Sequence, residues 1–316
     1  MKFVTYISPS TGSTAVGVVQ DDQIVGDPAS ATLLELVQTS DLVIAGERIL
    51  QAHNETIPLT EARMQAPIAA PPSFRDCMTF EGHVVNCNKW LDRPVPEVWY
   101  EQPTFYFSNP QAIVGPNDEV PIAPGSSMFD FELEIAAVVG RTGANLTPEQ
   151  AEDRIAGYMV LCDWSARDVQ MHEMTGSLGP VKGKDTVTST GPYLVTPDEL
   201  ADRRRNLGYD LTARVSVNGS VIGEGNWADT YWSFADVIAY ASRGTRVVPG
   251  DVIGGGTLPT CCLFEHLGLD TTSSRWLTPG DTVVLEVERL GRIETTVVTG
   301  PEVVPVPPRG SRLAAR

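Results

Sequence analysis

At residues 129–139 the chain reads FDFELEIAAVV, an apolar run that contains two glutamates two positions apart, Glu132 and Glu134. A short run of apolar and β-branched residues predicts a buried strand. Side chains two residues apart on a strand project from the same face, so this strand would hold two carboxylates side by side in an apolar setting. Two buried anions repel each other and lose hydration. Either one carboxylate is protonated or a cation lies between them, and a divalent metal ion is the simplest cation that satisfies both.

The composition predicts a folded chain of about two domains with a sizeable core. The 316 residues are 42% hydrophobic and 20% charged, and the net charge is −17. This charge disfavours nucleic acid and anionic membranes as partners, because both bind basic patches. No apolar stretch is long enough to span a bilayer, and residues 1–8 alternate like a strand instead of forming the apolar run of a signal peptide. We therefore expect a soluble, cytoplasmic protein.

The cysteines do not follow a disulfide or zinc pattern. Their number is odd, the chain is long, and no pair has the C-x-x-C spacing of a zinc site. All five are predicted to be reduced thiols: Cys77, Cys87, Cys162, Cys261 and Cys262.

Residues 1–70 are predicted to form a small N-terminal α/β domain. Its expected elements are a hairpin around Asp21-Asp22 and two helices with apolar residues at helical spacing, at residues 15–26, 32–37 and 42–53. A proline-rich segment at residues 67–72 is typical of a linker. The remaining residues, 71–316, would form the larger domain.

The larger domain is predicted to be mostly β. Strand patterns occur at residues 120–122, 131–140, 157–163, 193–195, 211–217 and 282–288, with hairpin turns at Asn218-Gly219 and at residues 289–292. Helices are expected to be fewer: from the capping box at Thr147 to about residue 156, at a similar signal after Thr196, and over residues 232–242. Because strands and helices do not alternate regularly, a doubly wound parallel sheet is disfavoured. The tail from Pro301 onward is expected to fray.

Asp163 is a candidate third carboxylate for the metal site. It ends the apolar run 157–163, where a strand gives way to a polar turn. A role as the cap of that turn is the alternative.

Residues 75–85 contain a carboxylate and a histidine, Asp76 and His83. If this segment is helical, the two residues are seven apart and share one face. A carboxylate and a histidine so placed can serve as a metal ligand and a general base. The alternative is that His83 is a partly buried structural histidine.

Two loops could bind a ligand. Lys182 and Lys184 lie in the glycine-containing loop 178–186, which could hold an anionic substrate or could be a solvated loop. The spacing of a P-loop is absent. The glycine run at residues 254–256 could let the backbone approach a ligand closely or could only form turns.

Taken together, five segments in this order resemble the fumarylacetoacetate hydrolase family: residues 129–134, 163–170, 183–185, 249–253 and 277–281. The resemblance covers roughly residues 75–298. It implies a C-terminal domain with a mixed β-roll or sandwich fold, a smaller N-terminal domain and a homodimer. It also implies a divalent metal ion, commonly magnesium, with manganese or calcium as alternatives.

The resemblance also implies a role for each candidate residue. The implied metal ligands are Asp76, Glu132, Glu134 and Asp163. His83 would activate a water molecule with the support of Glu265. The residues that resemble substrate and oxyanion contacts are Arg167, Gln170, Lys184 and Thr257.

Members of the family act on 1,3-dicarbonyl acids, so the implied activity is hydrolytic cleavage of a carbon–carbon bond in an acylpyruvate-like or fumarylacetoacetate-like acid. The metal would act as a Lewis acid, His83 would take a proton from water, and the metal with Lys184 would stabilise the enolate that leaves. Two alternatives stay open: a decarboxylase or tautomerase of 2-oxo acids, and a metal-binding homologue without catalysis. The first needs no attacking water, so the presence of His83 and Glu265 favours hydrolysis.

The cysteines mark departures from the family pattern. Cys162 stands where asparagine is common, Cys77 where aromatic residues are frequent, and Cys261-Cys262 where glycine is common. These changes flank the expected pocket and predict an unusual substrate or a drifted activity, while the implied metal ligands remain intact. A thiol nucleophile is a further alternative.

Overall fold

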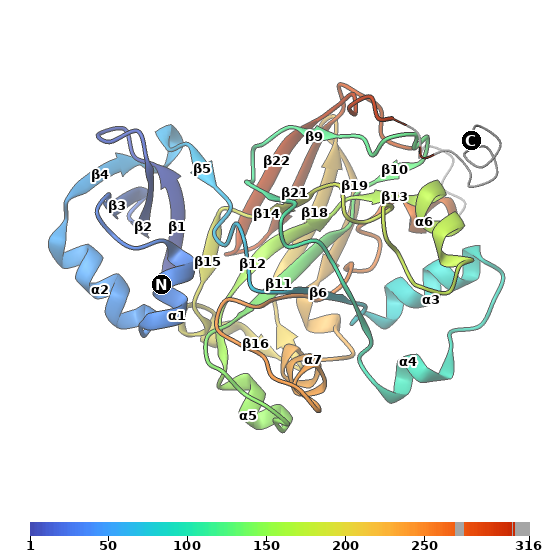
Figure 1. The fold of residues 1–316 in the computed structure, drawn as a ribbon, viewed down its shortest axis with the longest axis horizontal. Helices are drawn as coiled ribbons and strands as arrows, with labels where there is room; N and C mark the ends of the chain where they lie inside the picture. Colours follow the sequence, from blue (N-terminus) through green and yellow to red (C-terminus); the bar gives the residue numbers. More distant parts are fainter. Residues whose placement is uncertain (269–274, 305, 307–316) are drawn as a thin grey trace, which may run out of the picture.

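Two β-sheets form the framework of the computed structural model, which describes residues 1–268, 275–304 and 306 (Figure 1). The larger sheet has thirteen strands. Ten of them lie in the order β4 (Glu55–Pro58), β3 (Gln23–Asp27), β2 (Thr14–Gln20), β1 (Lys2–Ile7), β15 (Tyr193–Val195), β12 (Ile155–Asp163), β11 (Leu133–Val139), β20 (Val252–Gly254), β6 (Phe74–Cys77) and β7 (Phe105–Phe107). Three more pair beside this path: β5 (Met64–Gln65), β8 (Ile113–Val114) and β14 (Thr188–Thr190).

The second sheet has five strands, in the order β19 (Ser220–Asn226), β18 (Thr212–Val217), β21 (Thr282–Val287), β22 (Gly291–Val298) and β9 (Val120–Pro121). Two short pairs complete the β structure of the described residues: β10 (Phe129–Asp130) with β13 (Ser165–Ala166), and β16 (Arg204–Arg205) with β17 (Gly208–Tyr209).

The helices of the described residues are short and lie around the sheets (Figure 1). The α-helices are α1 (Leu33–Thr39), α2 (Leu42–Ala52), α3 (Glu81–Trp90), α4 (Glu97–Glu101), α5 (Pro148–Glu152), α6 (Arg167–Met174), α7 (Phe234–Ala241) and α8 (Leu263–Gly268). The 3-10 helices are η1 (Leu59–Glu61), η2 (Pro197–Arg203) and η3 (Trp227–Asp229).

The two sheets pack against each other around one hydrophobic core. Ile135 of β11 and Val160 of β12 belong to the same buried cluster as Val215, Leu285 and Ile293 of the second sheet. Most strand pairs are antiparallel, but β6 and β20 are parallel, so the larger sheet is mixed. The structure therefore confirms the predicted mostly β fold, in which two sheets face each other across an apolar layer.

Strands β11 and β12 are buried on both faces, which explains their nearly continuous apolar sequences. Ile135 and Val139 point into the core between the sheets, whereas Ala136 and Val138 belong to a second buried cluster. That cluster includes side chains from α1 and β1, so the N-terminal helices cover the other face of the same strands. The carboxylate of Glu134 consequently lies on a strand with apolar side chains packed on both of its faces.

The N-terminal unit continues the larger sheet, because β1 pairs with β15 as well as with β2. The predicted hairpin forms as β2 and β3, and the two predicted helices form as α1 and α2. Figure 1 shows this unit at one side of the molecule. The division of the chain at residue 70 stays a prediction.

Two predicted helices are shorter or tighter than expected. The helix predicted to run to about residue 156 ends at Glu152, because Ile155 already pairs with Val139 as the first residue of β12. The signal at Thr196 begins the 3-10 helix η2 instead of an α-helix. The Thr196 hydroxyl donates to the carbonyl oxygen of Met1 at 3.1 Å and does not cap η2.

Residues 75–85 are helical only from Glu81 onward, so the condition for a helical face shared by Asp76 and His83 is not met. Asp76 lies on strand β6, whose backbone pairs with β20 on one side and β7 on the other, and helix α3 begins only at Glu81. Pairing on both edges overrides the local helical spacing, because it satisfies the backbone groups of this segment within the sheet.

The remaining local predictions can be stated briefly. The six predicted strands and the two hairpin turns of the larger domain are present, and the helix predicted over residues 232–242 forms as α7. All five cysteines are free thiols, as predicted. Of the tail predicted to fray, residues 305 and 307–316 lie outside the described residues.

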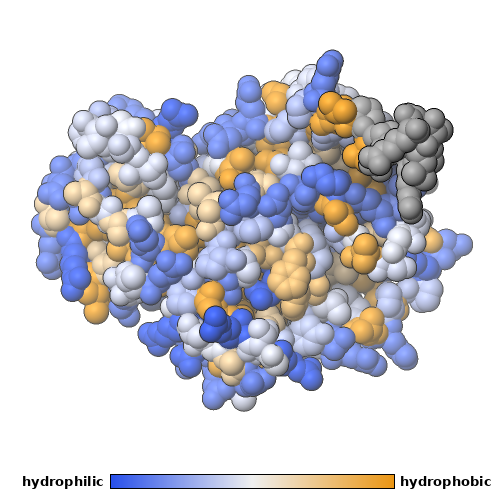
Figure 2. Space-filling model, in the orientation of Figure 1, coloured by the Kyte–Doolittle hydropathy of each residue, from blue (hydrophilic) through white to orange (hydrophobic). Residues whose placement is uncertain are grey.

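Among the described residues, no helix has the length and apolar character to cross a membrane. Figure 2 shows one face of the molecule, which is mostly hydrophilic with scattered hydrophobic side chains.

Candidate active site

One pocket of about 380 Å³ brings together the residues that the sequence singled out. All of them except Glu265 line it, and Glu265 lies behind His83. Carboxylates and cations form one side of the pocket, and apolar side chains form much of the rest, among them Val84, Trp99, Met174 and Phe264. Such a pocket suits a small acid with an apolar side group.

Three strands of the larger sheet place three carboxylates beside one another. Asp76 lies on β6, Glu134 on β11, and Asp163 ends β12. One oxygen from each lies within 4.8 Å of the others, and all three side chains are buried. We call Asp76, Glu134 and Asp163 the carboxylate cluster.

The glycine run after β20 leaves room for this cluster. A Cβ atom at Gly254 would lie 2.3 Å from Asp76 Oδ1 and 3.1 Å from Glu134 Oε2. The backbone N–H of Gly256 donates to Glu134 Oε2 at 2.8 Å. The close backbone approach that the sequence left as one of two alternatives is therefore present, and it serves the carboxylates.

The protonation of the cluster reflects its lack of compensating charge. Burial raises the pKa of Asp76 to about 6 and that of Asp163 to about 7. Burial together with the neighbouring Asp76 and Asp163 raises the pKa of Glu134 well above its usual range. These are the shifts expected of like charges forced together in an apolar site.

The residues fit a hard divalent cation. Asp163 Oδ1 is buried and has no hydrogen-bond partner among the described residues, so this oxygen is left to accept another ligand. Three carboxylates with an unpaired oxygen form the oxygen-only donor set that Mg²⁺, Mn²⁺ or Ca²⁺ prefers.

Glu132 is the fourth predicted metal ligand, and its surroundings differ from those of the cluster. Its carboxylate pairs with Lys184 Nζ and, at 2.7 Å, with Arg167 Nη2. Lys184 also contacts Asp163, at 2.5 Å, so the lysine bridges Glu132 to the cluster. Although burial opposes ionisation, Arg167 and Lys184 hold the pKa of Glu132 well below its usual range.

The loop that carries Lys184 is tied to helix α6. Glu173 on this helix accepts hydrogen bonds of 2.9–3.0 Å from the backbone N–H groups of Val181, Lys182 and Gly183. Lys184 is turned inward and buried, whereas Lys182 faces outward and pairs with Asp185 at 2.6 Å. The sequence left open whether this loop binds a ligand or is solvated. Lys184 faces the pocket and Lys182 faces solvent, so each alternative holds for one of the two lysines.

Arg167 is held by a residue that the sequence analysis did not single out. Asp130 accepts from Arg167 and also from the backbone N–H groups of Leu263 and Phe264, at the start of α8. Gln170 accepts from Arg167 Nη1 at 3.2 Å, and Thr257 is buried in the pocket wall. The signal for Asp130 was available, because it is a third acid in the same apolar run.

Tyr106 is another missed residue. It lies on strand β7, next to β6. Its hydroxyl donates to Asp163 Oδ2 at 2.7 Å and lies 3.4 Å from Asp76 Oδ2. The sequence around it carries no local signal for this role. Only the pairing of β6 with β7 brings the hydroxyl to the carboxylates.

His83 and Glu265 form a buried pair, although the predicted helix does not connect His83 to Asp76. His83 Nδ1 and Glu265 Oε1 are 2.7 Å apart. Asn86 Nδ2 and the backbone N–H of Thr260 donate to Glu265 Oε2 at 2.6 and 2.9 Å, which fixes the carboxylate. His83 Nε2 lies 4.0 Å from Glu132 Oε1 and so faces the acidic side of the pocket.

The charges of this pair reinforce each other. Although burial opposes the charged form, Glu265 raises the pKa of His83 to about 10. An imidazole held by a carboxylate and facing a pocket is the arrangement that moves protons in acid–base catalysis.

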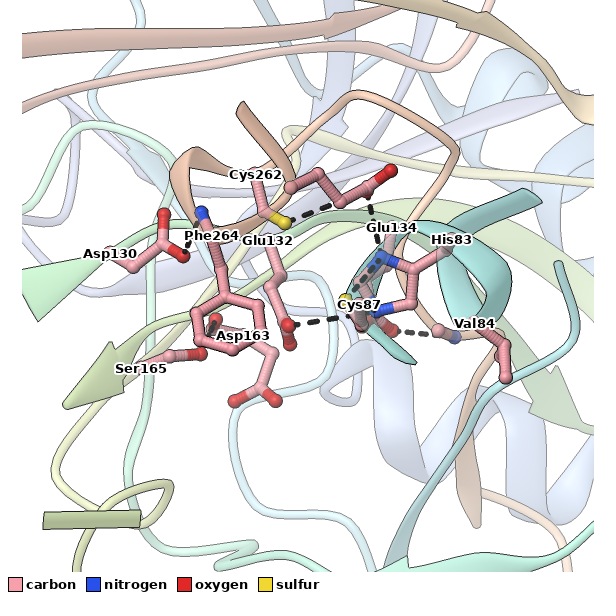
Figure 3. Close-up of polar contacts among 12 residues, drawn as sticks. His83, Val84, Cys87, Asp130, Glu132, Glu134, Asp163, Ser165, Cys262 and Phe264 are labelled. Carbon is pink, nitrogen blue, oxygen red and sulfur yellow. Dashed lines mark hydrogen bonds and ion pairs between the residues drawn. The ribbon is translucent and has the colours of Figure 1, made fainter. Parts of the chain in front are cut away.

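Two thiols lie beside this pair (Figure 3). Cys87 Sγ is 3.7 Å from His83 Nε2, and Cys262 Sγ is 3.5 Å from Glu265 Oε1. Burial raises the pKa of Cys262, and likewise of Cys77 and Cys162, well above the usual range. These three thiols are therefore protonated, which argues against a role as nucleophile.

Comparison with known proteins relates the chain to several enzymes. The family described as fumarylacetoacetate (FAA) hydrolase C-terminal matches residues 73–298. The mitochondrial oxaloacetate tautomerase FAHD2A of Homo sapiens is 32% identical over 84% of this chain and 80% of its own length. The 2,4-didehydro-3-deoxy-L-rhamnonate hydrolase of Sphingomonas sp. (strain SKA58) is 30% identical over 68% of each chain.

A solved structure shares the fold. The maleylpyruvate hydrolase of Sphingobium sp. SYK-6, in complex with manganese (II) ion and pyruvate, superposes with a TM-score of 0.69 at 22% identity, over 95% of this chain and 100% of that chain. The relatives thus include tautomerase and hydrolase activities, and one of them binds a divalent ion.

Proposed function

The chain belongs to the fumarylacetoacetate hydrolase family, and we propose that it is a metal-dependent hydrolase that cleaves a carbon–carbon bond in a 1,3-dicarbonyl acid. The pair of His83 and Glu265 carries the proposal. Cleavage by water requires a base that faces the bound substrate, and His83 Nε2 faces the acidic side of the pocket while its other ring nitrogen is held by Glu265.

We propose that Asp76, Glu134 and Asp163, with Glu132 beside them, hold a divalent ion. Magnesium is the first choice, and manganese or calcium the alternatives. When bound, the ion supplies a Lewis acid for the substrate oxygens and a positive charge that favours the neutral form of His83. The unpaired Asp163 Oδ1 and the raised pKa values of the three carboxylates support this assignment.

The chain's own residues perform the remaining tasks. Neutral His83 accepts a proton from water, and Glu265 stabilises the imidazolium that forms. Lys184 and Arg167 hold positive charge on the side of the pocket where the enolate develops. Gln170 and Thr257 line the same pocket and would orient the substrate, while the apolar wall around Trp99 and Phe264 would receive its acyl group.

Tautomerisation of a 2-oxo diacid is the second candidate. The relative FAHD2A supports it, since its name is that of an oxaloacetate tautomerase. The same histidine could carry a proton between carbon and oxygen without an attacking water.

The test compares both reactions in one preparation. Cleavage is followed as loss of the diketone absorbance of an acylpyruvate, and tautomerisation as loss of the enol absorbance of oxaloacetate, each with Mg²⁺ and with chelator. The variant His83→Ala should lower cleavage by about 10²- to 10⁴-fold. His172→Ala, at an exposed histidine of α6, is the matched control and should leave cleavage unchanged. Rapid tautomerisation without any cleavage would overturn the hydrolase proposal in favour of the second candidate.

We further propose that the enzyme works in the cytoplasm as a homodimer on a small keto acid, with neither nucleic acid nor membrane as a partner. Light scattering coupled to size-exclusion chromatography tests the dimer. A mass of one chain over a range of concentrations would refute it.

A further inference from the structure

Three donor groups of different chemistry meet at the catalytic pair, and a fourth lies close to it. They are His83 Nδ1, Glu265 Oε1 and the sulphur atoms of Cys87 and Cys262, and we call these residues the imidazole cluster. The atoms of His83, Cys262 and Glu265 lie within 4.8 Å of one another. Cys87 is not part of that group, and its Sγ lies 3.8 Å from His83 Nδ1 and 3.7 Å from His83 Nε2.

Two of the spacings among these donors are close to those around a tetrahedral ion. Zinc bonds of about 2.0 Å to nitrogen and oxygen and about 2.3 Å to sulphur give tetrahedral edges of about 3.3 Å between nitrogen and oxygen and about 3.5 Å to sulphur. The edge from Cys87 Sγ to His83 Nδ1 is 3.8 Å, and that from Cys262 Sγ to Glu265 Oε1 is 3.5 Å. The edge between His83 and Glu265, at 2.7 Å, would have to open, because it is a hydrogen bond that the ion would replace. The half-buried Cys87 side chain would also have to turn toward the other three donors to supply the fourth ligand.

The cluster is also built to hold an ion. Asn86 and the backbone of Thr260 fix the second oxygen of Glu265, which is the kind of outer support that orients metal ligands. His83, Cys262 and Glu265 are each at most 5% exposed. His83 and Cys87 line the pocket, so an ion could enter from solvent.

We propose that Cys87, Cys262, His83 and Glu265 form a second metal site that takes a thiophilic divalent ion such as Zn²⁺ and thereby blocks the catalytic pair. The ion binds the ring nitrogen and the carboxylate that otherwise share a proton. This proton and those of the two thiols leave to solvent as the site fills, so a loaded site has no free pair for proton transfer. The carboxylate cluster offers only oxygen and selects hard ions, whereas thiolate and imidazole select Zn²⁺. The carboxylate cluster would therefore bind hard ions such as Mg²⁺, and the imidazole cluster would bind softer ions such as Zn²⁺.

Cobalt (II) provides a readout that does not depend on activity. The complete protein is saturated with Mg²⁺ to fill the carboxylate cluster and is then titrated with Co²⁺. A thiolate-to-cobalt charge-transfer band with tetrahedral d–d bands is expected at one ion per chain, and Zn²⁺ should displace both. Because the signal reports sulphur ligation, it distinguishes failure of this site from failure of the proposed hydrolase activity. Absence of the band at saturating Co²⁺ would overturn the proposal.

Three cysteine variants locate the signal. Cys87→Ala and Cys262→Ala should each weaken Co²⁺ binding by at least about tenfold. Cys261→Ala is the matched control, since this neighbouring thiol is equally buried but packs in the hydrophobic core. A band that persists at full strength in Cys87→Ala, the variant at the more exposed thiol, would also refute the site. Thermal unfolding of each variant with Mg²⁺ alone verifies that the fold is kept.

Discussion

The carboxylate cluster and the imidazole cluster meet at one pocket, and their acids are equally buried, yet these acids behave in opposite ways. Burial raises the pKa of Asp76 and Asp163, and it does the same to Glu134 with the help of its neighbours. Glu265 is buried as deeply, and although burial opposes ionisation, His83 lowers its pKa. Depth alone therefore does not decide the charge of an acid here. The partner decides it, and the acids without a sufficient cationic partner are the ones that fit a metal ion.

Glu132 and Lys184 lie between the two clusters. Glu132 faces His83 on one side and binds the lysine on the other, and the lysine reaches Asp163. A change of charge in one cluster should therefore shift the pKa values of the groups in the other through these two side chains.

The largest expected effect comes from removing one charge of the carboxylate cluster. Asp76→Asn should lower cleavage by roughly 10³-fold, because the several kcal/mol that a bound ion supplies to the transition state are lost. Stabilisation of the fold by added Mg²⁺ should disappear at the same time. Thermal unfolding with increasing Mg²⁺ and steady-state kinetics measure the two losses. A variant that Mg²⁺ stabilises as strongly as the natural chain would contradict the assignment of this cluster.

A smaller effect is expected when the partner of the histidine loses its charge. Glu265→Gln should lower kcat by about 10²-fold, since the carboxylate no longer stabilises the imidazolium. The pKa of His83, about 10 beside Glu265, should fall, because a neutral amide does not favour the charged ring. An NMR titration of the ring measures this shift directly. An unmoved titration would show that Glu265 does not control the histidine.

The hydroxyl that spans two acids of the carboxylate cluster should matter less. Tyr106→Phe removes the hydrogen bond to Asp163 and leaves the ring in place. We expect Mg²⁺ to bind about tenfold more weakly, as for other losses of outer support around a metal site. The imidazole cluster should keep its pH titration, which serves as the internal control. Calorimetric titration of Mg²⁺ into both proteins provides the measurement.

The smallest expected effect is on stability. Asp76 and Asp163 titrate at about 6 and about 7 in the folded protein, against about 3.9 in an unfolded chain. The folded state thus binds more protons than the unfolded state between about pH 4 and 7, so these acids make the free energy of unfolding fall as pH rises through this window. With chelator, Tm should therefore drop by more across this range than with Mg²⁺, because a bound ion keeps the acids ionised in the folded state. Equal pH dependence in both conditions would argue against uncompensated acids.

Local pattern was sufficient to predict the framework. The runs that became β11 and β12 are apolar because both faces of these strands are buried, and the Asn218-Gly219 turn fixes a hairpin by its own geometry. The candidate residues were found because their segments match a family pattern in order. Neither inference required knowledge of how distant segments meet.

Tertiary pairing produced the differences. Asp76 would share a helical face with His83 only if residues 75–85 were one helix. Pairing with two strands makes its segment β6 instead, and the two residues reach the same pocket from separate elements. Tyr106 could not be found, because a single tyrosine in a short strand acquires its role only when β7 pairs with β6. The different partners of Glu132 and Glu134 likewise depend on Lys184 and Arg167, which lie more than thirty residues further along the chain.

Glu173 accepts hydrogen bonds from three consecutive backbone N–H groups. The pocket should therefore stay assembled even if the chain is cut between Glu173 and these groups. Between that glutamate and the groups it holds, Leu178 is 89% exposed and offers a protease an accessible bond. A cut there would leave Arg167 on one fragment and Lys184 on the other. The hydrogen bonds of Glu173 would still join the two fragments. A nicked protein should therefore elute as one species in size-exclusion chromatography, and its fragments should separate only on denaturation.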